Sequence, residues 1–213
     1  MAGSVITVAQ QKGGSGKTTV SANLAVGFLR MGRSVALVDI DPQGSLGRWF
    51  MTRLEADESA VEGLEFATSS AWGITYECRK LAERCDVVIV DTPPKADSDL
   101  RPALRAADLV VVPVSMSHVD LWATEGVLDL ARREDRETLV VLNRTRPNTR
   151  LARDVAEAAE KMEARIARAQ IANRVSYAEA FGLGRSAAEG RKTPARAEIE
   201  ALAAEVAEVL ETG

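Results

Sequence analysis

The residues best suited to chemistry lie in one short stretch near the N-terminus, KGGSGKTT, from Lys12 to Thr19. Its glycines allow backbone N–H groups to turn inward around the oxygens of a phosphate. Lys17 would neutralise those oxygens, and the hydroxyl of Thr18 would be offered to Mg²⁺. The residues expected to contact a bound nucleotide in this stretch are Gly13, Gly14, Ser15, Gly16, Lys17, Thr18 and Thr19, and Lys12 is considered separately.

The entrance of this loop departs from the common phosphate-binding pattern. A glycine usually stands six residues before the lysine, but here that place is taken by Gln11, and a second lysine, Lys12, follows at once. One interpretation of Lys12 is a solvated surface lysine. The other is a cation with a role of its own at the mouth of the loop.

Carboxylates follow two other apolar runs. Asp91 ends the run DVVIVD, where it could hold Mg²⁺ through water as a Walker B aspartate. A helix cap is the alternative, but the following DTPP is a stiff proline turn. Asp39 and Asp41 stand two residues apart in VDIDPQGS, so both could lean toward the same nucleotide. Asp41 could also serve only an Asp-Pro turn. We expect Thr18 and Asp91 at the metal.

Short β-branched runs that alternate with helical patterns are expected to position these residues. The runs are apolar on both faces, which predicts buried parallel strands. The expected strands are Ser4–Ala9, Val35–Asp39, Val87–Asp91, Leu109–Val114 and Leu139–Asn143. A helix is expected over Lys17–Met31, closed by Gly32, so the glycine loop would join a strand to a helix. The prediction is a three-layer α/β P-loop fold: a mainly parallel sheet covered by helices on both faces, in a single domain over residues 1–213.

The last third of the chain differs in composition. Ala, Arg and Glu dominate Leu151–Arg168, which predicts a solvated helix, and IARAQI could add a late edge strand. A final helix would place Ile199, Leu202 and Val206 on one face and most of its glutamates on the other. Burial in the core is expected for Trp49 and Trp122.

Composition limits the function classes. The formal net charge is -4, so a nucleic-acid site would have to be local. Cys78 and Cys85 lack metal-ligand spacing, and His118 is the only histidine, so neither a multi-histidine metal site nor a histidine triad is expected within one chain. The sequence starts with neither a secretory signal nor an apolar span, which predicts a cytoplasmic protein without membrane attachment.

In combination, KGGSGKTT, VDIDPQGS, VIVDTPP and ALRAADLVVVPV with HVDLWAT resemble the ParA/MinD class of deviant Walker-A ATPases, specifically the short ParA-like type. The resemblance spans Ser4 to Asn143. It implies slow hydrolysis of ATP, with Mg²⁺, by a switch that forms a homodimer when ATP-bound. The dimer would bind double-stranded DNA of the nucleoid without sequence preference. A ParB-like or other adaptor would stimulate hydrolysis, and the cargo would be a plasmid, a chromosome or a large protein cluster.

The same resemblance implies roles for individual residues. Lys12 would be the inter-subunit cation, since a lysine at the loop mouth can reach a second triphosphate. Asp41 would orient or deprotonate the attacking water, which makes Lys12, Lys17 and Asp41 the catalytic set. Asp39 and Asp91 would support the metal, and the sequence leaves open how Asp39 and Asp41 divide their roles. Asn143 would read the adenine, although an Asx turn suits it equally. The DNA surface would include basic residues of the C-terminal third, which could alternatively be paired with glutamates: Arg165, Arg168, Arg174, Arg185, Arg191 and Lys192.

Three rival functions have their own signatures. A MinD-like membrane regulator would end in a basic amphipathic helix, whereas EIEALAAEVAEVLETG has neither Lys nor Arg. A cluster-delivery ATPase would need suitably placed cysteines. A metabolic P-loop enzyme of the synthetase or kinase type would bind its substrate at the same sheet edge with similar motifs, and DNA-dependent ATP turnover separates it from the switch.

Overall fold

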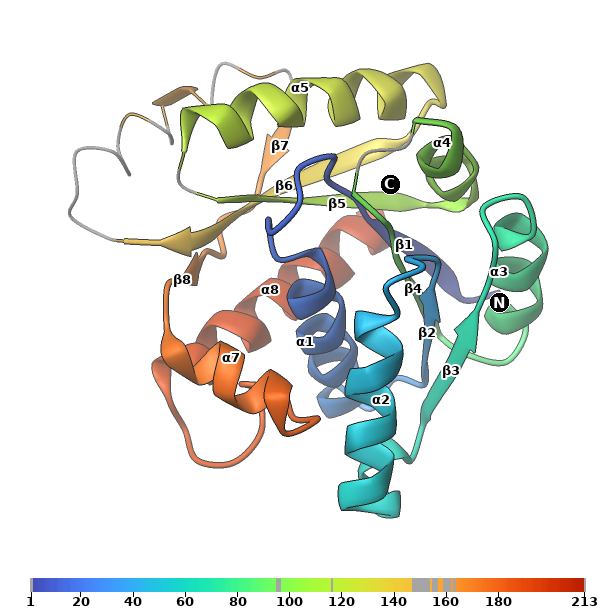
Figure 1. Cartoon of the computed structure of the whole chain (residues 1–213), viewed down its shortest axis with the longest axis vertical. Coiled ribbons are helices and arrows are strands. Elements are labelled where there is room, and N and C mark those ends of the chain that lie inside the picture. The colour runs from blue at the N-terminus through green and yellow to red at the C-terminus, as the bar shows by residue number, and fades with distance from the viewer. Residues whose placement is uncertain are drawn as a thin grey trace.

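An eight-stranded, entirely parallel sheet forms the centre of the molecule in the computed structural model (Figure 1). The structure describes residues 2–94, 97–115, 117–146 and 164–212, together with residues 154, 157, 158 and 162. Along the sheet the order is β3-β2-β4-β1-β5-β6-β7, and β8 also pairs with β6. The strands are β1 (Ser4–Val8), β2 (Val35–Asp39), β3 (Leu64–Thr68), β4 (Val87–Asp91), β5 (Leu109–Ser115), β6 (Glu137–Thr145), β7 (Arg165–Ile166) and β8 (Ile171–Ala172).

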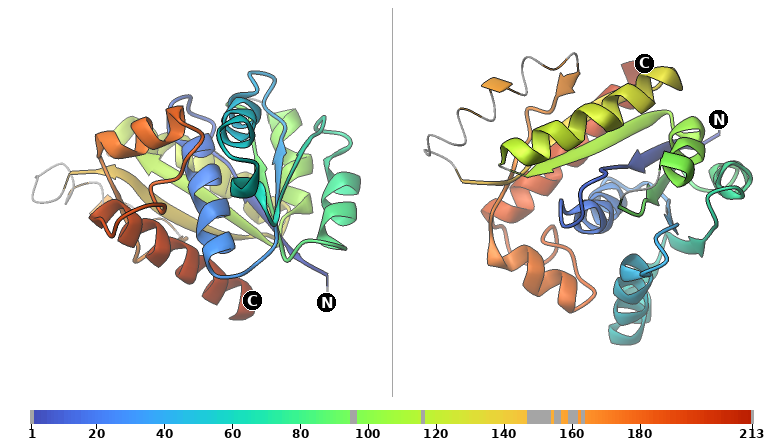
Figure 2. Two further views of the ribbon diagram at one scale, coloured as in Figure 1. Left: turned by 90° about the horizontal axis from the view of Figure 1, so that it is seen from below. Right: turned by 45° about the horizontal axis from the view of Figure 1, so that its top comes forward.

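Helices cover both faces of the sheet, which is why its strands are apolar throughout (Figure 2). Helices α1 (Lys17–Arg30), α2 (Ser45–Ala56), α7 (Val175–Gly182) and α8 (Pro194–Thr212) pack on one face. The other face carries α3 (Ile74–Ala82), α4 (Asp97–Ala106) and α5 (His118–Arg133). A short 3-10 turn, η1 (Glu58–Val61), precedes β3. The arrangement is the three-layer α/β fold that the sequence predicts.

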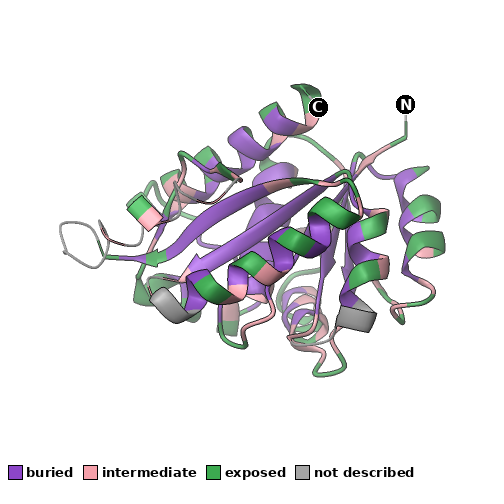
Figure 3. Cartoon of the chain, turned by 90° about the horizontal axis from the view of Figure 1, so that it is seen from above, coloured by how far each residue is buried: buried purple, intermediate pink, exposed green. Residues whose placement is uncertain are grey.

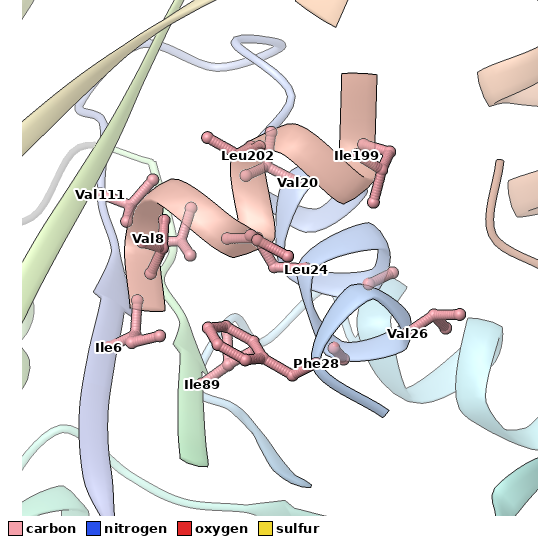
Figure 4. Close-up of a cluster of buried hydrophobic side chains, with 14 of the residues drawn as sticks. Ile6, Val8, Val20, Leu24, Val26, Phe28, Ile89, Val111, Ile199 and Leu202 are labelled. Atoms are coloured by element: carbon pink, nitrogen blue, oxygen red, sulfur yellow. The ribbon is translucent and has the colours of Figure 1, made fainter. Parts of the chain in front are cut away.

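The largest core cluster lies between the sheet and the pair α1 and α8. Figure 4 draws Val20, Leu24 and Phe28 of α1 beside Ile199 and Leu202 of α8. A Cβ added to Gly27 would lie 2.8 Å from the Cβ of Ala203, so a glycine is needed where the two helices approach most closely. The central strands are buried almost throughout, and the outer helices expose one side each (Figure 3).

Most sequence-based expectations for the elements are confirmed. All five expected strands are present with ends that differ by at most a few residues, and the helix after the glycine loop is α1. The late edge strand is present as two short pieces, β7 and β8. Most of the helix expected over Leu151–Arg168 lies outside the described residues, and its end is wrong because Arg165–Ile166 is a strand.

The two tryptophans that were expected in the core differ. Trp49 is buried, with 2% of its surface exposed, but Trp122 on α5 is 69% exposed. The expectation for Trp122 is therefore wrong: Leu121, Thr124 and Leu128 supply the buried stripe of this helix, and Trp122 falls on the opposite side. In the part of the chain that the structure describes, none of the helices combines the length and the apolar character needed to cross a bilayer.

Candidate nucleotide-binding site

The glycine loop joins β1 to α1 at the carboxyl edge of the sheet. Gly14 and Gly16 have left-handed backbones, with φ of 79° and 94°. A Cβ on Gly16 would lie 2.4 Å from Nδ2 of Asn143, so this position is closed to larger residues. Around Gly13 and Gly14 there is open space instead. The loop therefore packs tightly on its protein side and leaves room on the side where a phosphate would lie.

Lys17 and Ser15 are the buried polar side chains of the loop. Lys17 is 6% exposed, and burial lowers the pKa of its ammonium group although the negative charges of Asp91 and Asp41 act in the opposite direction. Ser15 is 2% exposed, and its hydroxyl oxygen has no hydrogen-bond partner within the described residues. Burying these two polar groups costs free energy, and a bound anion would offset that cost by pairing with the Lys17 ammonium group and accepting a hydrogen bond from the Ser15 hydroxyl.

Asp91, at the end of β4, is fully buried beside the start of α1. Its Oδ1 accepts a hydrogen bond of 3.1 Å from the Ser21 hydroxyl, and the Thr18 side chain also hydrogen-bonds to the carboxyl. Oδ2 has no partner among the described residues. Burial raises the pKa of Asp91 to about 7, against the opposing effect of these hydrogen bonds.

These residues fit a magnesium ion of the kind that binds together with a nucleotide. The described residues contain no cluster of three histidine, cysteine or acidic side chains that could hold an ion unaided. Mg²⁺ commonly takes one or two protein oxygens and completes its shell with phosphate oxygens and water. The unpartnered Oδ2 of Asp91 and the hydroxyl of Thr18 provide oxygens of that kind.

Asp39 and Asp41 differ in their surroundings. Asp39, at the end of β2, pairs in register with Asp91 on β4. Its oxygens accept backbone hydrogen bonds from Asp41 (3.0 Å) and Gly47 (3.1 Å), while burial raises its pKa. Asp41 is half-buried and accepts a hydrogen bond of 2.9 Å from the backbone N–H of Gln43. Asp39 therefore fixes the loop before α2, and Asp41 is the carboxylate nearer to open space.

Lys12 forms an ion pair within the chain. Its ammonium group pairs with Asp120 on α5, whose side chain is 4% exposed, whereas that of Lys12 is 38% exposed. The preceding Gln10 is buried and donates to the Thr124 hydroxyl on the same helix at 3.0 Å. Helix α5 thus holds the entrance of the glycine loop at two consecutive turns.

Two cavities meet at the loop. One, of about 430 Å³, is lined by residues that include Gly13, Lys17, Thr18 and Asp41, and Lys12 is not among them. The other, of about 380 Å³, lies beyond Gly16 and is lined by Asn143, Asn173 and Tyr177, among others. A larger cavity of about 580 Å³ near Arg53 and Glu189 does not include the loop. By size and lining, the first suits phosphates and the second suits a base.

Asn143 uses its side chain within the protein. Its Nδ2 donates to the carbonyl of Ser15 at 2.8 Å, and its Oδ1 accepts from the backbone N–H of Arg144 at 2.8 Å. The residue therefore fastens the glycine loop to the end of β6 while it lines the base cavity. In place of a turn at the strand end, the amide makes a contact between elements that are far apart in sequence.

The six basic residues considered for DNA fall into two groups. Arg165 is paired with Glu137, Arg168 with Glu205 and Glu208, and Arg174 with Glu198. Arg185, Arg191 and Lys192 are exposed, and no hydrogen bond or ion pair from their side chains is found within the described residues. Only the second group offers cations without an acidic partner at hydrogen-bonding distance.

Two residues of this site, Asp120 and Ser21, are not predicted from the sequence. Asp120 lies in HVDLWAT, but nothing in the local pattern shows that its side chain turns toward Lys12 rather than to solvent. Ser21 lies one helical turn after Lys17 and donates to Asp91. The spacing of four from Lys17 is the only signal that could have indicated Ser21.

Comparisons with known proteins agree with this geometry. Residues 6–187 match the CobQ/CobB/MinD/ParA nucleotide binding domain. The chain is 32% identical over 183 residues to "Maintenance of carboxysome distribution protein A" of Halothiobacillus neapolitanus, covering 82% of each chain. It is 36% identical over 149 residues to "Chromosome-partitioning ATPase Soj" of Thermus thermophilus, covering 59% of each.

Solved structures show the same fold. The cell division ATPase MinD of Pyrococcus furiosus superimposes with a TM-score of 0.81 at 22% identity, covering 97% of this chain and 99% of that one. The apo McdA structure from Cyanothece gives a TM-score of 0.80 at 18% identity, covering 95% of this chain and 99% of that one. The glycine loop carries both Lys12 and Lys17, and Asp39 and Asp91 lie at the ends of neighbouring strands. The chain belongs to the CobQ/CobB/MinD/ParA family of nucleotide-binding domains.

Proposed function

We propose that this protein is an ATP-dependent switch whose ATP-bound form dimerises, binds DNA without sequence preference and positions a cargo. The observation that carries the proposal is the placement of the two lysines. Lys17 lines the phosphate cavity, whereas Lys12 does not, and Lys12 stands at the mouth of the loop. One cation thus serves the chain's own nucleotide, and the other, outside this cavity, would serve a second nucleotide brought by another copy.

Hydrolysis would use the residues around the phosphate cavity. Lys17 offsets the charge of the phosphates, and Asp41 orients or deprotonates the attacking water. Asp91 and Thr18 would hold Mg²⁺, with Asp39 supporting the site through the loop that it fixes. The ion supplies electrostatic stabilisation of charge on the phosphate oxygens. Two relatives whose names refer to carboxysome distribution and chromosome partitioning support this class of activity.

Dimerisation is proposed to exchange one partner of Lys12 for another. In the single chain Lys12 pairs with the buried Asp120, so it must leave this carboxylate to contact a phosphate across an interface. The exchange is favourable only when a triphosphate arrives, because a polyphosphate offers more charge than one carboxylate. The ion pair with Asp120 would then hold the nucleotide-free protein as a monomer.

The test compares the two lysines by analytical ultracentrifugation with a non-hydrolysable ATP analogue. Lys12→Ala should bind the analogue with near-normal affinity yet fail to dimerise, whereas Lys17→Ala should fail to bind it. Asp120→Asn serves as a matched variant, since it removes the competing charge and should dimerise at a lower analogue concentration. A Lys12→Ala protein that dimerises like the wild type contradicts the proposal.

The DNA surface is proposed to centre on Arg185, Arg191 and Lys192. A dimer would present two copies of this cluster, and the two weak sites would act together. Replacing all three with Ala should abolish a gel shift that the ATP-bound wild type gives with DNA of any sequence. Arg168→Ala is the control, because that side chain already pairs with Glu205 and Glu208. The shift should weaken steeply as salt rises.

A membrane role for the last helix is disfavoured by its packing. The apolar face of α8 lies against α1 in the core, so Ile199, Leu202 and Val206 are not available to lipid. Helix α8 also presents glutamates, which anionic lipid would repel. We therefore propose localisation in the cytoplasm on the nucleoid, which fluorescence microscopy of a tagged protein tests.

A metabolic enzyme is the second candidate. Cobyrinic acid a,c-diamide synthase from Mycobacterium smegmatis, solved with an ATP analogue and magnesium, shares this fold with a TM-score of 0.79 at 23% identity. Measuring ATP turnover with DNA but without a metabolite separates the two candidates. Turnover that requires a small carboxylic acid and ignores DNA would favour the synthetase-type enzyme.

A further inference from the structure

The backbone at Arg144 is unusual for its residue type. Among the described residues other than glycine, only Arg144 (φ 53°) and Asp135 (φ 55°) are left-handed. Asp135 lies in the turn between α5 and β6, where aspartate is common in this conformation. The long side chain of arginine does not form the local hydrogen bond that stabilises aspartate in this conformation. Residues held in such sparsely populated backbone conformations cluster at functional sites.

A bulge at Arg144 interrupts the pairing of β6 with β8. Asn143 pairs with Ile171 and Thr145 with Ala172, so Arg144 is the additional residue on β6. Bulges of this kind redirect a side chain and occur next to active sites. The conformation is held by the Asn143 side chain, which accepts the Arg144 N–H and donates to Ser15 of the glycine loop. The strand distortion is therefore built into the same contact that positions the loop.

Residue Arg144 borders both nucleotide cavities. Arg144 lines the phosphate cavity and the base cavity, and it shares this position with Gly16 and Thr19. If one cavity holds the base and the other the phosphates, the point where they meet would hold the sugar and the first phosphate of the nucleotide. Arg144 thus lies where the link between base and polyphosphate would be expected.

The Arg144 side chain is exposed, and no hydrogen bond or ion pair from it is found in the part of the chain that the structure describes. Arg174, which also lines the base cavity, is different because its guanidinium donates two hydrogen bonds to Glu198. Of these two guanidinium groups, that of Arg144 is available to a ligand.

We infer that Arg144 is a further nucleotide-binding residue, whose guanidinium contacts the α-phosphate. The inference rests on the proposed binding of ATP, and it adds a cation that recognises ATP, ADP and AMP alike. This role differs from that of Lys12, which concerns a second copy, and from that of Lys17, which concerns the outer phosphates. A guanidinium is suited to the task because its planar fork can donate two hydrogen bonds to one phosphate.

The test measures displacement of a fluorescent ADP by ATP, ADP, AMP and adenosine from the full chain. Arg144→Ala should lower the affinity for ATP, ADP and AMP by a similar factor of about 10, as expected for the loss of a charge-assisted hydrogen bond. The affinity for adenosine should be unchanged. Arg144→Gly should give the same result while accepting φ 53° without strain, which separates the cation from the conformation. Arg144→Lys should recover part of the affinity.

The control is Arg79→Ala, which replaces an exposed arginine of α3 that lines neither nucleotide cavity. Wild-type affinity in both Arg144→Ala and Arg144→Gly would overturn the inference. It would also be overturned by a loss confined to ATP, which would indicate the outer phosphate, or by an equal loss for adenosine, which would indicate the base. If the wild-type protein itself binds none of these ligands, the proposed function fails instead.

Discussion

Replacing Asp91 with Asn should stabilise the nucleotide-free protein, and the gain should grow with pH. Burial raises the pKa of Asp91 from 3.8 to about 7. Between these values the folded chain keeps a proton that the unfolded chain has lost, so this group lowers stability as pH rises from about 4 through about 7. Asn has no proton to lose. At 1.36 kcal/mol per pH unit, the advantage of the variant should increase by about 2 to 3 kcal/mol between pH 5 and pH 8.

Urea unfolding in EDTA, followed by circular dichroism at both pH values, measures this difference for Asp91→Asn and the wild type. Titrating groups common to both proteins cancel in the comparison. Asp129→Asn is the matched control, because it makes the same replacement at a carboxyl group that is 54% exposed and not buried. A stability difference for Asp91→Asn that is the same at pH 5 and pH 8 would refute the burial argument.

Three further outcomes are expected. Lys17→Ala should keep the fold and lose ATP binding in a titration with a fluorescent analogue, and undiminished affinity would remove the phosphate-loop assignment. Asp41→Ala should bind ATP and dimerise but hydrolyse ATP at least about 10-fold more slowly in a phosphate-release assay, because Asp41 is proposed to orient or deprotonate the attacking water. An unchanged rate of stimulated hydrolysis would assign catalysis to another group. Gly16→Ala should lower the free energy of unfolding by about 2 kcal/mol, since φ is 94° and a Cβ would meet Asn143, whereas Gly13→Ala, with open space around it, should be nearly neutral in the same urea titration.

The sheet and the glycine loop could be predicted because their signals are local. Continuous apolar runs such as Val87–Asp91 require cover on both faces, and the spacing within KGGSGKTT fixes a strand–loop–helix connection. The sequence does not predict strand β3, because LEFAT mixes polar and apolar residues without a regular period over only five positions at the sheet edge. Edge strands are only half covered, so they lack the continuous apolar run.

What the sequence could not predict depends on contacts between distant segments. The ion pair of Lys12 with Asp120 and the hydrogen bond from Asn143 to the Ser15 carbonyl each join residues more than one hundred positions apart. The arginines of the C-terminal third look alike by composition, but Arg174 is neutralised by Glu198 and Arg191 is not. Arg168 and Arg174 have acidic partners because α8 packs with its glutamates beside them. The order of residues along the chain does not show this packing.

The contact between α1 and α8 has a consequence for synthesis of the protein. Gly27 emerges from the ribosome long before Ala203, the residue against which it packs. At about 5–20 residues per second, the interval is roughly ten to thirty-five seconds. During this time the apolar stripe of α1 has no helix to cover it, although the strands beneath are being added. Nascent chains should therefore expose this stripe to chaperones until α8 is released, and stalling before Ile199 should yield protease-sensitive, aggregation-prone chains.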